Sequence, residues 1–191
     1  MKPEGFVLFA TVLGPCGVAW GAQGLRASQL PEPDEAALRA RLRRRSPGLS
    51  EAPPPPWVQQ VIDDLGALLR GEPADLSRVP LDLRGLPDLD CRVYEVVRRI
   101  PRGATLSYGE VAVQLGDRLL ARSVGRALAR NPFAPVVPCH RVLGADGRPG
   151  GFSARGGLRT KLRLLTIEGA SPTGEPDLFA PASAGPGDSA Q

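Results

Sequence analysis

Apolar runs broken by Gly and Pro predict a small β-sheet within residues 1–90. The expected strands are residues 6–13, residues 18–20 and a third strand near Leu81 and Leu83, with a turn at residues 14–17. The first apolar run has an alternative interpretation as a secretory signal, because small residues follow it. Glu4 offsets the charge of Lys2, and Gly14-Pro15 interrupts the run, so the pattern favours a strand.

Two helices with a helical apolar period are expected beside this sheet. Residues 34–45 begin at Asp34 and end in three arginines, which suits the negative end of a helix dipole. Residues 57–69 follow a proline-rich loop at residues 47–56. They carry an apolar stripe on one face, made of Val58, Val61, Ile62, Leu65 and Leu69.

The second half of the chain predicts a helix-turn-helix. Asp90 is expected to cap a helix that runs through Arg99, and Ser107 with Glu110 forms a capping box for a helix to about Leu115. After the turn Gly116-Asp117, a third helix is expected over residues 118–130. A last helix is expected over residues 158–166.

The third of these helices carries three distinct stripes at helical spacing. One is basic, one is apolar and one is made of small residues: Arg122, Arg126 and Arg130; Leu120, Val124 and Leu128; Ala121, Gly125 and Ala129. Gly inside a helix costs about 1 kcal/mol relative to Ala. A small-residue face flanked by arginines suits close approach to nucleic acid, and tight packing inside the protein is the alternative.

Composition and charge narrow the class of protein. The chain has 191 residues, is 42% hydrophobic and 23% charged, and contains three cysteines and one histidine. These values are typical of a globular protein in a reducing compartment, without a membrane span, a disulfide scaffold or a zinc site.

The positive charge is concentrated in one segment. Residues 1–90 carry ten basic and twelve acidic residues, whereas residues 91–170 carry fourteen basic and five acidic residues, a net charge of +9. Residues 171–191 carry three acidic residues and no basic residue. Such an excess indicates a phosphate-rich partner such as nucleic acid. A GC-rich genome would explain the preference for Arg, but not the loss of acidic residues.

The only histidine, His140, follows Cys139 in an Arg-rich segment. An adjacent imidazole and nearby positive charge are conditions that activate a cysteine nucleophile. If the segment is extended, neighbouring side chains point to opposite faces, so a bridging water is the simpler link between thiol and imidazole. Glu168 is expected to orient His140. The alternative is a buried structural cysteine beside a chance histidine.

These motifs occur in a specific order. Pro138-Cys139-His140-Arg141 follows the helix-turn-helix and Asn131-Pro132, and precedes a Gly-rich loop, a helix and Glu168-Gly169. Over residues 88–170 this order resembles the O6-alkylguanine-DNA alkyltransferase family, the methylated-DNA–protein-cysteine methyltransferases. The resemblance implies DNA repair by direct reversal: base flipping, then irreversible transfer of the alkyl group from O6-alkylguanine to Cys139, once per molecule. O4-alkylthymine is a second candidate substrate.

The resemblance also implies a role for each matching residue. In the active site, Cys139 would accept the alkyl group. His140 would take the thiol proton through a water, and Glu168 would orient His140. Tyr108 would donate a proton to the guanine ring, and Asn131 would brace the active-site turn. The flipped base would contact Val142, Ser153 and Phe152, where Phe152 replaces the family's usual tyrosine. Arg122 would fill the gap in the base stack, beside the other expected DNA contacts, Ala121, Ser123, Gly125, Arg126, Ala129 and Arg130.

The expected fold class is α/β (α+β) with two domains. A small N-terminal sheet with helices occupies residues 1–87, and a mainly helical, winged-helix-like domain with the helix-turn-helix occupies residues 88–170. Residues 171–191 are expected to be a disordered tail. Neither a metal nor a cofactor is expected, because moving a carbon to sulfur needs neither.

The expected partner is double-stranded DNA with O6-alkylguanine, bound by a monomer in the cytoplasm, at the nucleoid, or in a eukaryotic nucleus, with no membrane contact. Residues 175–179 resemble short acidic peptides that dock on sliding clamps. Two other functions stay open. A non-catalytic helix-turn-helix protein that binds lesions or regulates genes would form no covalent product, and a cysteine hydrolase would turn over repeatedly.

Overall fold

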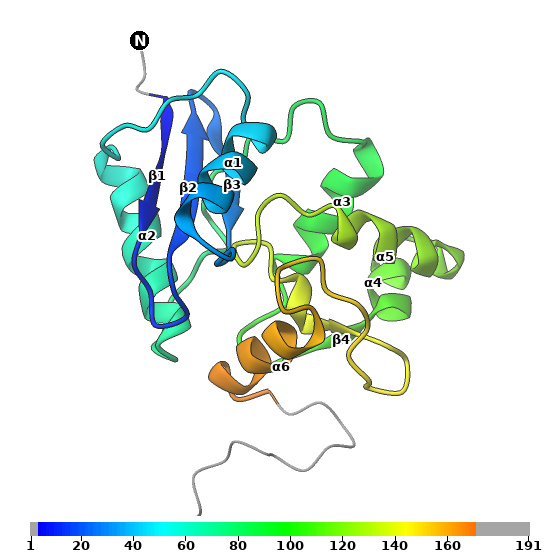
Figure 1. Ribbon diagram of the computed structural model, residues 1–191. Helices are drawn as coiled ribbons and strands as arrows, with labels where there is room; N and C mark the ends of the chain where they lie inside the picture. The colour runs from blue at the N-terminus through cyan, green and yellow to red at the C-terminus, as the bar shows by residue number, and fades with distance from the viewer. Residues whose placement is uncertain (1–3, 171–191) are drawn as a thin grey trace, which may run out of the picture.

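The N-terminal part is built on a three-stranded antiparallel sheet. The computed structural model describes residues 4–170. The strands are β1 (Gly5–Phe9), β2 (Cys16–Gly21) and β3 (Gly24–Gln29), and they pair in that order (Figure 1). Residues 171–191, and with them the expected disordered tail and clamp-docking peptide, lie outside the described residues.

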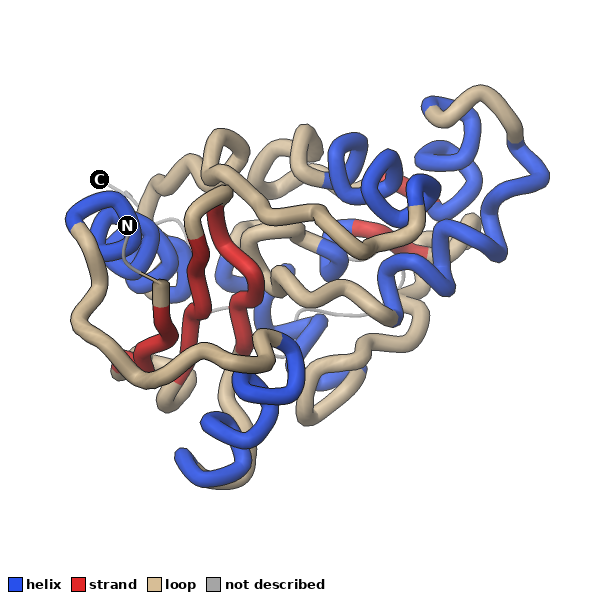
Figure 2. Tube along the Cα trace, turned by 90° about the horizontal axis from the view of Figure 1, so that it is seen from above, coloured by secondary structure: helices blue, strands red, loops and turns tan. Residues whose placement is uncertain are grey.

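Side-chain alternation along β2 divides the sheet into two buried faces. Ala19 packs with Phe6, Leu38 and Leu42 on the face that α1 (Glu35–Arg45) covers. Val18 and Trp20 point to the other face and join the main core, which includes the apolar stripe of α2 (Pro56–Leu69). Figure 2 shows the strands side by side with a helix against them. Both helices lie where the sequence predicts them, and Asp34 caps α1 by accepting from the Ala37 amide at 2.7 Å.

The expected strands need correction. The first strand ends at Phe9 rather than residue 13, because Thr11 and Gly14 pair in a turn. The third strand is β3 and not the segment near Leu81 and Leu83, and Leu81 forms only an isolated bridge with Leu25. β3 escapes prediction because two of its buried positions, Ser28 and Gln29, are polar.

The C-terminal part is mainly helical, as expected. Its elements are α3 (Asp88–Val97), β4 (Leu106–Ser107), α4 (Tyr108–Gln114), the 3-10 helix η1 (Arg118–Leu120), α5 (Ala121–Ala129), the 3-10 helix η2 (Cys139–Arg141), β5 (Val142–Leu143) and α6 (Leu158–Ile167). β4 and β5 form a short parallel pair. The capping box of α4 is confirmed, because Ser107 accepts from the Glu110 amide and Glu110 accepts from the Ser107 amide.

Two expectations in this part are wrong in detail. Asp90 is not the helix cap: α3 starts at Asp88 after Pro87, and Asp90 is a buried residue of the first turn. Its carboxylate accepts two hydrogen bonds from Arg130, at 2.8 and 3.1 Å. The expected helix over residues 118–130 is split into η1 and α5. In both cases a helix is present in the expected region, and its exact bounds differ from those expected.

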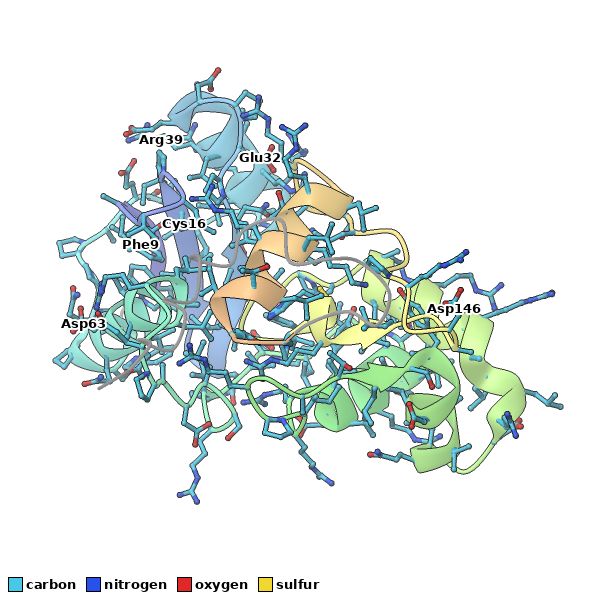
Figure 3. All side chains as sticks on the ribbon, turned by 90° about the horizontal axis from the view of Figure 1, so that it is seen from below. Phe9, Cys16, Glu32, Arg39, Asp63 and Asp146 are labelled. Carbon is cyan, nitrogen blue, oxygen red and sulfur yellow. The ribbon has the colours of Figure 1, made fainter. Side chains whose placement is uncertain are left out.

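The two parts share one continuous core. The main cluster of buried apolar residues contains Trp20 and Leu65 from the N-terminal part together with Tyr94, Val124 and Val137 from the C-terminal part. The expected two-domain division at residues 87 and 88 stays a prediction. No helix within residues 4–170 is both long enough and apolar enough to cross a membrane. Figure 3 shows Phe9 and Cys16 on the sheet, with Asp146 at the far end of the molecule.

Candidate active site

Cys139 opens the 3-10 helix η2 and is 4% exposed. The segment is therefore not extended at this point: the chain turns, and the Arg141 amide donates to the Pro138 carbonyl at 2.9 Å. Nδ2 of Asn131 donates to Sγ of Cys139 at 3.3 Å and to the Val137 carbonyl at 2.9 Å. Asn131 thus holds both the turn and the sulfur.

Burial decides the protonation state of this thiol. Burial raises the pKa of Cys139 above its usual range, and the Asn131 hydrogen bond and the positive charge of Lys161 offset only part of that effect. The resting side chain is then a thiol rather than a thiolate. A thiolate nucleophile must form by proton transfer to a base.

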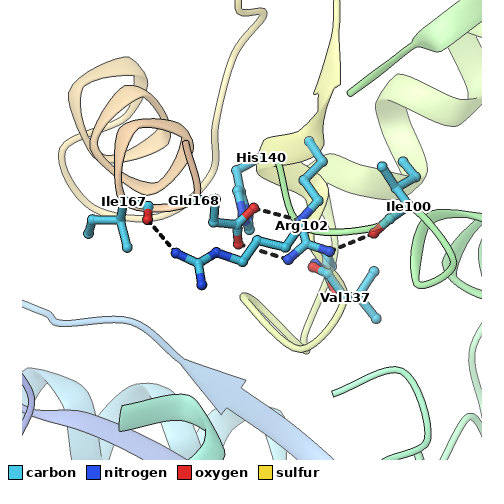
Figure 4. A network of polar contacts seen from close by, with 8 residues as sticks. Ile100, Arg102, Val137, His140, Ile167 and Glu168 are labelled. Atoms are coloured by element: carbon cyan, nitrogen blue, oxygen red, sulfur yellow. Dashed lines mark hydrogen bonds and ion pairs between the residues drawn. The ribbon is translucent and has the colours of Figure 1, made fainter. Parts of the chain in front are cut away.

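The residue after Cys139 is a buried histidine that contacts a carboxylate. Oε1 of Glu168 lies 2.9 Å from Nε2 of His140, and both side chains are fully buried. Arg141 donates to the same carboxylate through Nε at 2.7 Å and through Nη2 at 2.8 Å. Figure 4 shows His140 and Glu168 in this network, with Arg102 donating to the Ile167 carbonyl beside it. The expected contact between Glu168 and His140 is present.

The electrostatics of this cluster keep the imidazole neutral and the carboxylate charged. Burial lowers the pKa of His140, although the hydrogen bond with Glu168 opposes it. Burial alone would raise the pKa of Glu168, but the hydrogen bonds from His140 and Arg141 outweigh it and lower that pKa to about 2. Nδ1 of His140 is buried and has no hydrogen-bond partner among the described residues. With Nε2 turned to Glu168, the ring nitrogen available to accept a proton is Nδ1.

Lys161 is a member of the site that sequence reasoning missed. Its side chain is fully buried, and Nζ donates to the Val142 carbonyl at 2.6 Å and lies 5.8 Å from the centre of the Tyr108 ring. Burial lowers its pKa to about 8. One signal was available in the sequence, because Lys161 is the single lysine among the fourteen basic residues of residues 91–170.

Tyr108 lies at the first position of α4, beside the Gly-rich loop. Burial raises the pKa of its hydroxyl, which therefore keeps its proton at neutral pH. A Cβ placed on Gly150 would lie 2.8 Å from that hydroxyl oxygen, so the loop backbone sits directly against the tyrosine. Of the other residues expected around the base, Val142 is buried, Phe152 packs on the core and Ser153 is exposed. The described contacts do not bring Ser153 to the thiol.

The outer face of α5 exposes several of the residues expected to contact DNA, and their contact with DNA stays a prediction. Arg122, Arg126 and Ala129 are exposed, whereas Val124, Ala127 and Leu128 are buried in the core. Arg126 donates to Ser123 at 2.9 Å. Arg130 differs from Arg122 and Arg126 because its guanidinium donates two hydrogen bonds to the Asp90 carboxylate. A Cβ on Gly125 would meet only Tyr108 carbons at 3.8 and 3.9 Å, which is ordinary contact. Internal packing therefore does not require glycine there.

Within residues 4–170, no three His, Cys, Asp or Glu side chains are grouped closely enough to hold a metal ion. A cavity of about 580 Å³ lies near the start of α4, lined by residues that include Ser107, Glu110, Arg118 and Leu143. Cys139 itself is almost closed off from solvent, at 4% exposure.

Comparison with known proteins gives one consistent family. Residues 88–170 match the family model for the DNA-binding domain of 6-O-methylguanine DNA methyltransferase. The methylated-DNA–protein-cysteine methyltransferase of Methanothermobacter thermautotrophicus is 38% identical over 159 residues, which is 83% of this chain and 82% of the relative. A protein of Thermus thermophilus named DNA base-flipping protein is 47% identical over 111 residues, covering 58% of this chain and 73% of the relative.

A solved structure agrees in fold. The crystal structure of Mycobacterium tuberculosis OGT in complex with DNA is similar with a TM-score of 0.70 and 33% identity, covering 86% of this chain and 92% of that one. The expected α/β fold class is therefore confirmed. With its buried cysteine, imidazole and carboxylate in one cluster, the chain belongs to the methylated-DNA–protein-cysteine methyltransferase family, enzymes of direct-reversal DNA repair.

Proposed function

We propose that this protein removes the alkyl group from O6-alkylguanine in duplex DNA and keeps it on Sγ of Cys139. The thiolate attacks the alkyl carbon, a C–S bond forms, and the carbon–O6 bond breaks with its electron pair left on the guanine. The product is a stable thioether, so each molecule reacts once. The observation that carries the proposal is the buried thiol of Cys139, followed in the chain by the buried His140. Nε2 of His140 lies 2.9 Å from the Glu168 carboxylate, which leaves Nδ1 to accept a proton.

Each member of the cluster has a distinct task. Nδ1 of His140 takes the thiol proton through a bridging water, and Glu168 stabilises the imidazolium that results. Asn131 stabilises the sulfur by its amide hydrogen bond. Tyr108 keeps its proton because burial raises its pKa, and it gives that proton to the guanine ring as negative charge develops there.

The base reaches this site by leaving the DNA stack. Extrusion costs a few kcal/mol, and the exposed side chain of Arg122 fills the gap and compensates for part of that cost. The small face of Ala121, Gly125 and Ala129 allows α5 to approach the duplex, with Ser123, Arg126 and Arg130 at its margin contacting the backbone. The M. tuberculosis relative was solved with DNA, which supports DNA as the partner.

The proposal also covers the contacts of the flipped base, the oligomeric state and the cellular location. The flipped guanine contacts the Val142 carbonyl, Ser153 and Phe152, and O4-alkylthymine is a second candidate substrate. We propose that the protein acts as a monomer, because one chain holds every group named above. It acts where the DNA is, in the cytoplasm or nucleoid, or in the nucleus if the source is eukaryotic.

The test is the mass of the intact protein after incubation with a duplex that contains one O6-methylguanine. We expect the mass to rise by one methyl group per molecule, located on the peptide that contains Cys139, and excess substrate to add no more. Cys139→Ala should gain nothing, whereas Cys91→Ala, at a half-buried cysteine outside the site, should react like the parent protein. An unchanged parent mass would refute the proposal.

A second candidate function is lesion binding without transfer. The relative named DNA base-flipping protein favours it, because that name describes flipping alone. A pure binder would hold the modified duplex tightly and show no covalent product, and its affinity would survive Cys139→Ala. A cysteine hydrolase would instead release product many times per molecule. The same mass measurement, followed over time, separates the three.

A further inference from the structure

Arg45 connects the N-terminal part of the chain to the proposed active site. It is the last residue of α1, and its side chain is half-buried, whereas its neighbours Arg43 and Arg44 are exposed. Nη1 of Arg45 donates to the Asn131 carbonyl at 3.0 Å. Arg45 also lines a cleft of about 600 Å³, together with Pro132 and Phe133 from the C-terminal part.

Asn131, whose carbonyl accepts a hydrogen bond from Arg45, also donates a hydrogen bond to the sulfur of Cys139. The Asn131 amide nitrogen donates to the Leu128 carbonyl, and the side-chain oxygen accepts from the Phe133 amide at 2.9 Å. The side-chain nitrogen donates to the Val137 carbonyl and to Sγ of Cys139. Of the Asn131 hydrogen bonds within residues 4–170, only the one to its carbonyl comes from the N-terminal part. This carbonyl follows the C-terminus of α5, where a positive charge is favourable.

Arg45 forms no ion pair with any described residue. Within residues 4–170, no carboxylate lies within ion-pair distance of it, and the nearby Glu32 is paired with Arg41 at 3.0 Å. Burial and the charge of Arg41 lower the pKa of Arg45 to about 10, so it stays protonated at neutral pH. Its positive charge, together with that of Lys161 from α6, lowers the pKa of the Cys139 thiol against the effect of burial.

We propose that Arg45 is a positioning residue for the thiol. By fixing the Asn131 carbonyl, it sets the direction of the amide that donates to Sγ of Cys139, so the N-terminal part completes the active site. This inference rests on the proposed function, since it assigns Arg45 to the same reaction. A simpler alternative is that Arg45 only ties the two parts of the chain together.

The chain offers a control for that alternative. Ser28 of β3 also ties the parts together, because its amide donates to the Pro132 carbonyl at 2.9 Å and its hydroxyl donates to the Ala134 carbonyl at 3.1 Å. Ser28→Ala removes the second of these contacts and leaves Asn131 untouched. Arg44→Gln removes the same charge as Arg45→Gln from an exposed position one residue earlier in the helix.

The experiment follows alkylation of Cys139 by iodoacetamide as a function of pH, with the Cys139 peptide identified by mass. Among the described residues, the charged or titratable groups that face this thiol include Lys161, Arg45, Tyr94 and Tyr108, with the His140–Glu168 pair beside them. We expect Arg45→Gln to move the profile to higher pH and to slow methyl transfer from duplex DNA by on the order of tenfold. Arg45→Lys, which restores a charged donor, should move the profile back toward that of the parent.

Ser28→Ala and Arg44→Gln should leave the profile where it is, even if Ser28→Ala lowers the unfolding temperature. The proposal is overturned if Arg45→Gln keeps the parent profile, or if Ser28→Ala shifts it equally. If Arg45→Gln does not fold, Arg45→Met is measured in its place: a profile at higher pH supports the proposal, and the parent profile overturns it. Iodoacetamide needs no DNA, so a failure of methyl transfer in the parent protein is distinguishable from a failure of this inference.

Discussion

Glu168 and His140 meet at the end of α6, where Oε1 of the carboxylate lies 2.9 Å from Nε2 of the imidazole and neither side chain is exposed. Glu168 is also the counter-charge of the buried Arg141. One carboxylate therefore serves both the proposed base and the stability of the fold. Its contribution to the stability of the fold can be followed as a function of pH.

Glu168→Gln should destabilise the protein by about 3 kcal/mol at pH 7, because it leaves Arg141 buried without an opposite charge. The pKa of Glu168 is lowered from 4.5 to about 2 in the folded state, so the carboxylate's contribution is complete above pH 4.5 and is lost as pH falls toward 2. Urea unfolding at several pH values should show the difference between parent and variant narrowing over that range.

Glu72→Gln is the matched control for this experiment. Glu72 pairs with Arg70 on the surface, where its side chain is 51% exposed, so solvent screens the pair and it contributes little to stability. A Glu168→Gln variant as stable as Glu72→Gln at pH 7 would contradict the importance of the buried cluster.

Lys161→Met should slow methyl transfer by about tenfold at pH 7, because the thiolate loses a nearby positive charge. Burial lowers the pKa of Lys161 to about 8, so the lysine itself becomes neutral as pH rises through that value. The ratio of parent to variant rates should therefore fall toward one above about pH 9. The reaction of free O6-benzylguanine base, followed by protein mass, measures this without DNA.

Arg159→Met, at an exposed position of the same helix, should react like the parent at every pH. A constant ratio between parent and Lys161→Met across pH 7 to about 9 would show that the lysine acts through packing and not through its charge.

The sequence predicts helices best where the end signals are local. Asp34 caps α1, and Ser107 with Glu110 caps α4, because a capping bond joins residues three apart. Asp90 carries the same kind of local signal, yet its carboxylate is bound by Arg130, forty residues away. β3 was missed because Ser28 is buried through bonds to residues 132 and 134 rather than by apolar contact.

The same distinction applies to the candidate site. Cys139, His140 and Glu168 were predicted because their residue types and order carry chemistry in themselves. Lys161 and Arg45 were missed because their roles come from where the fold puts them: one is buried against Val142, and the other reaches Asn131 from the far half of the chain. No pattern in a single sequence distinguishes Arg45 from the two arginines before it.

Gly150→Ala should slow methyl transfer with little effect on DNA affinity. The added methyl would lie 2.8 Å from the Tyr108 hydroxyl and 3.2 Å from Cε2, which forces the ring or the loop to shift. We expect a loss of about tenfold or more in rate, since a misplacement of a reacting group by about 1 Å can cost 100-fold. Gly151→Ala is the control, because its added methyl meets nothing within 4 Å. Equal rates for the two variants would show that Tyr108 does not need its present position.

Gly125→Ala should change stability and DNA binding in opposite directions. Inside α5 the protein leaves room for the methyl group, whose nearest neighbour would be a Tyr108 carbon at 3.8 Å. Replacing a helix-interior glycine by alanine should therefore stabilise the fold by about 0.5–1 kcal/mol, seen as a higher unfolding temperature. If the small-residue face of α5 lies against the duplex, the same methyl must weaken binding to an oligonucleotide, measured by titration at fixed salt. Ala127→Gly, at a buried position of the same helix, should lower stability and leave intrinsic DNA affinity of the folded protein unchanged. A Gly125→Ala variant that is more stable and binds DNA as tightly as the parent would remove this face from the interface.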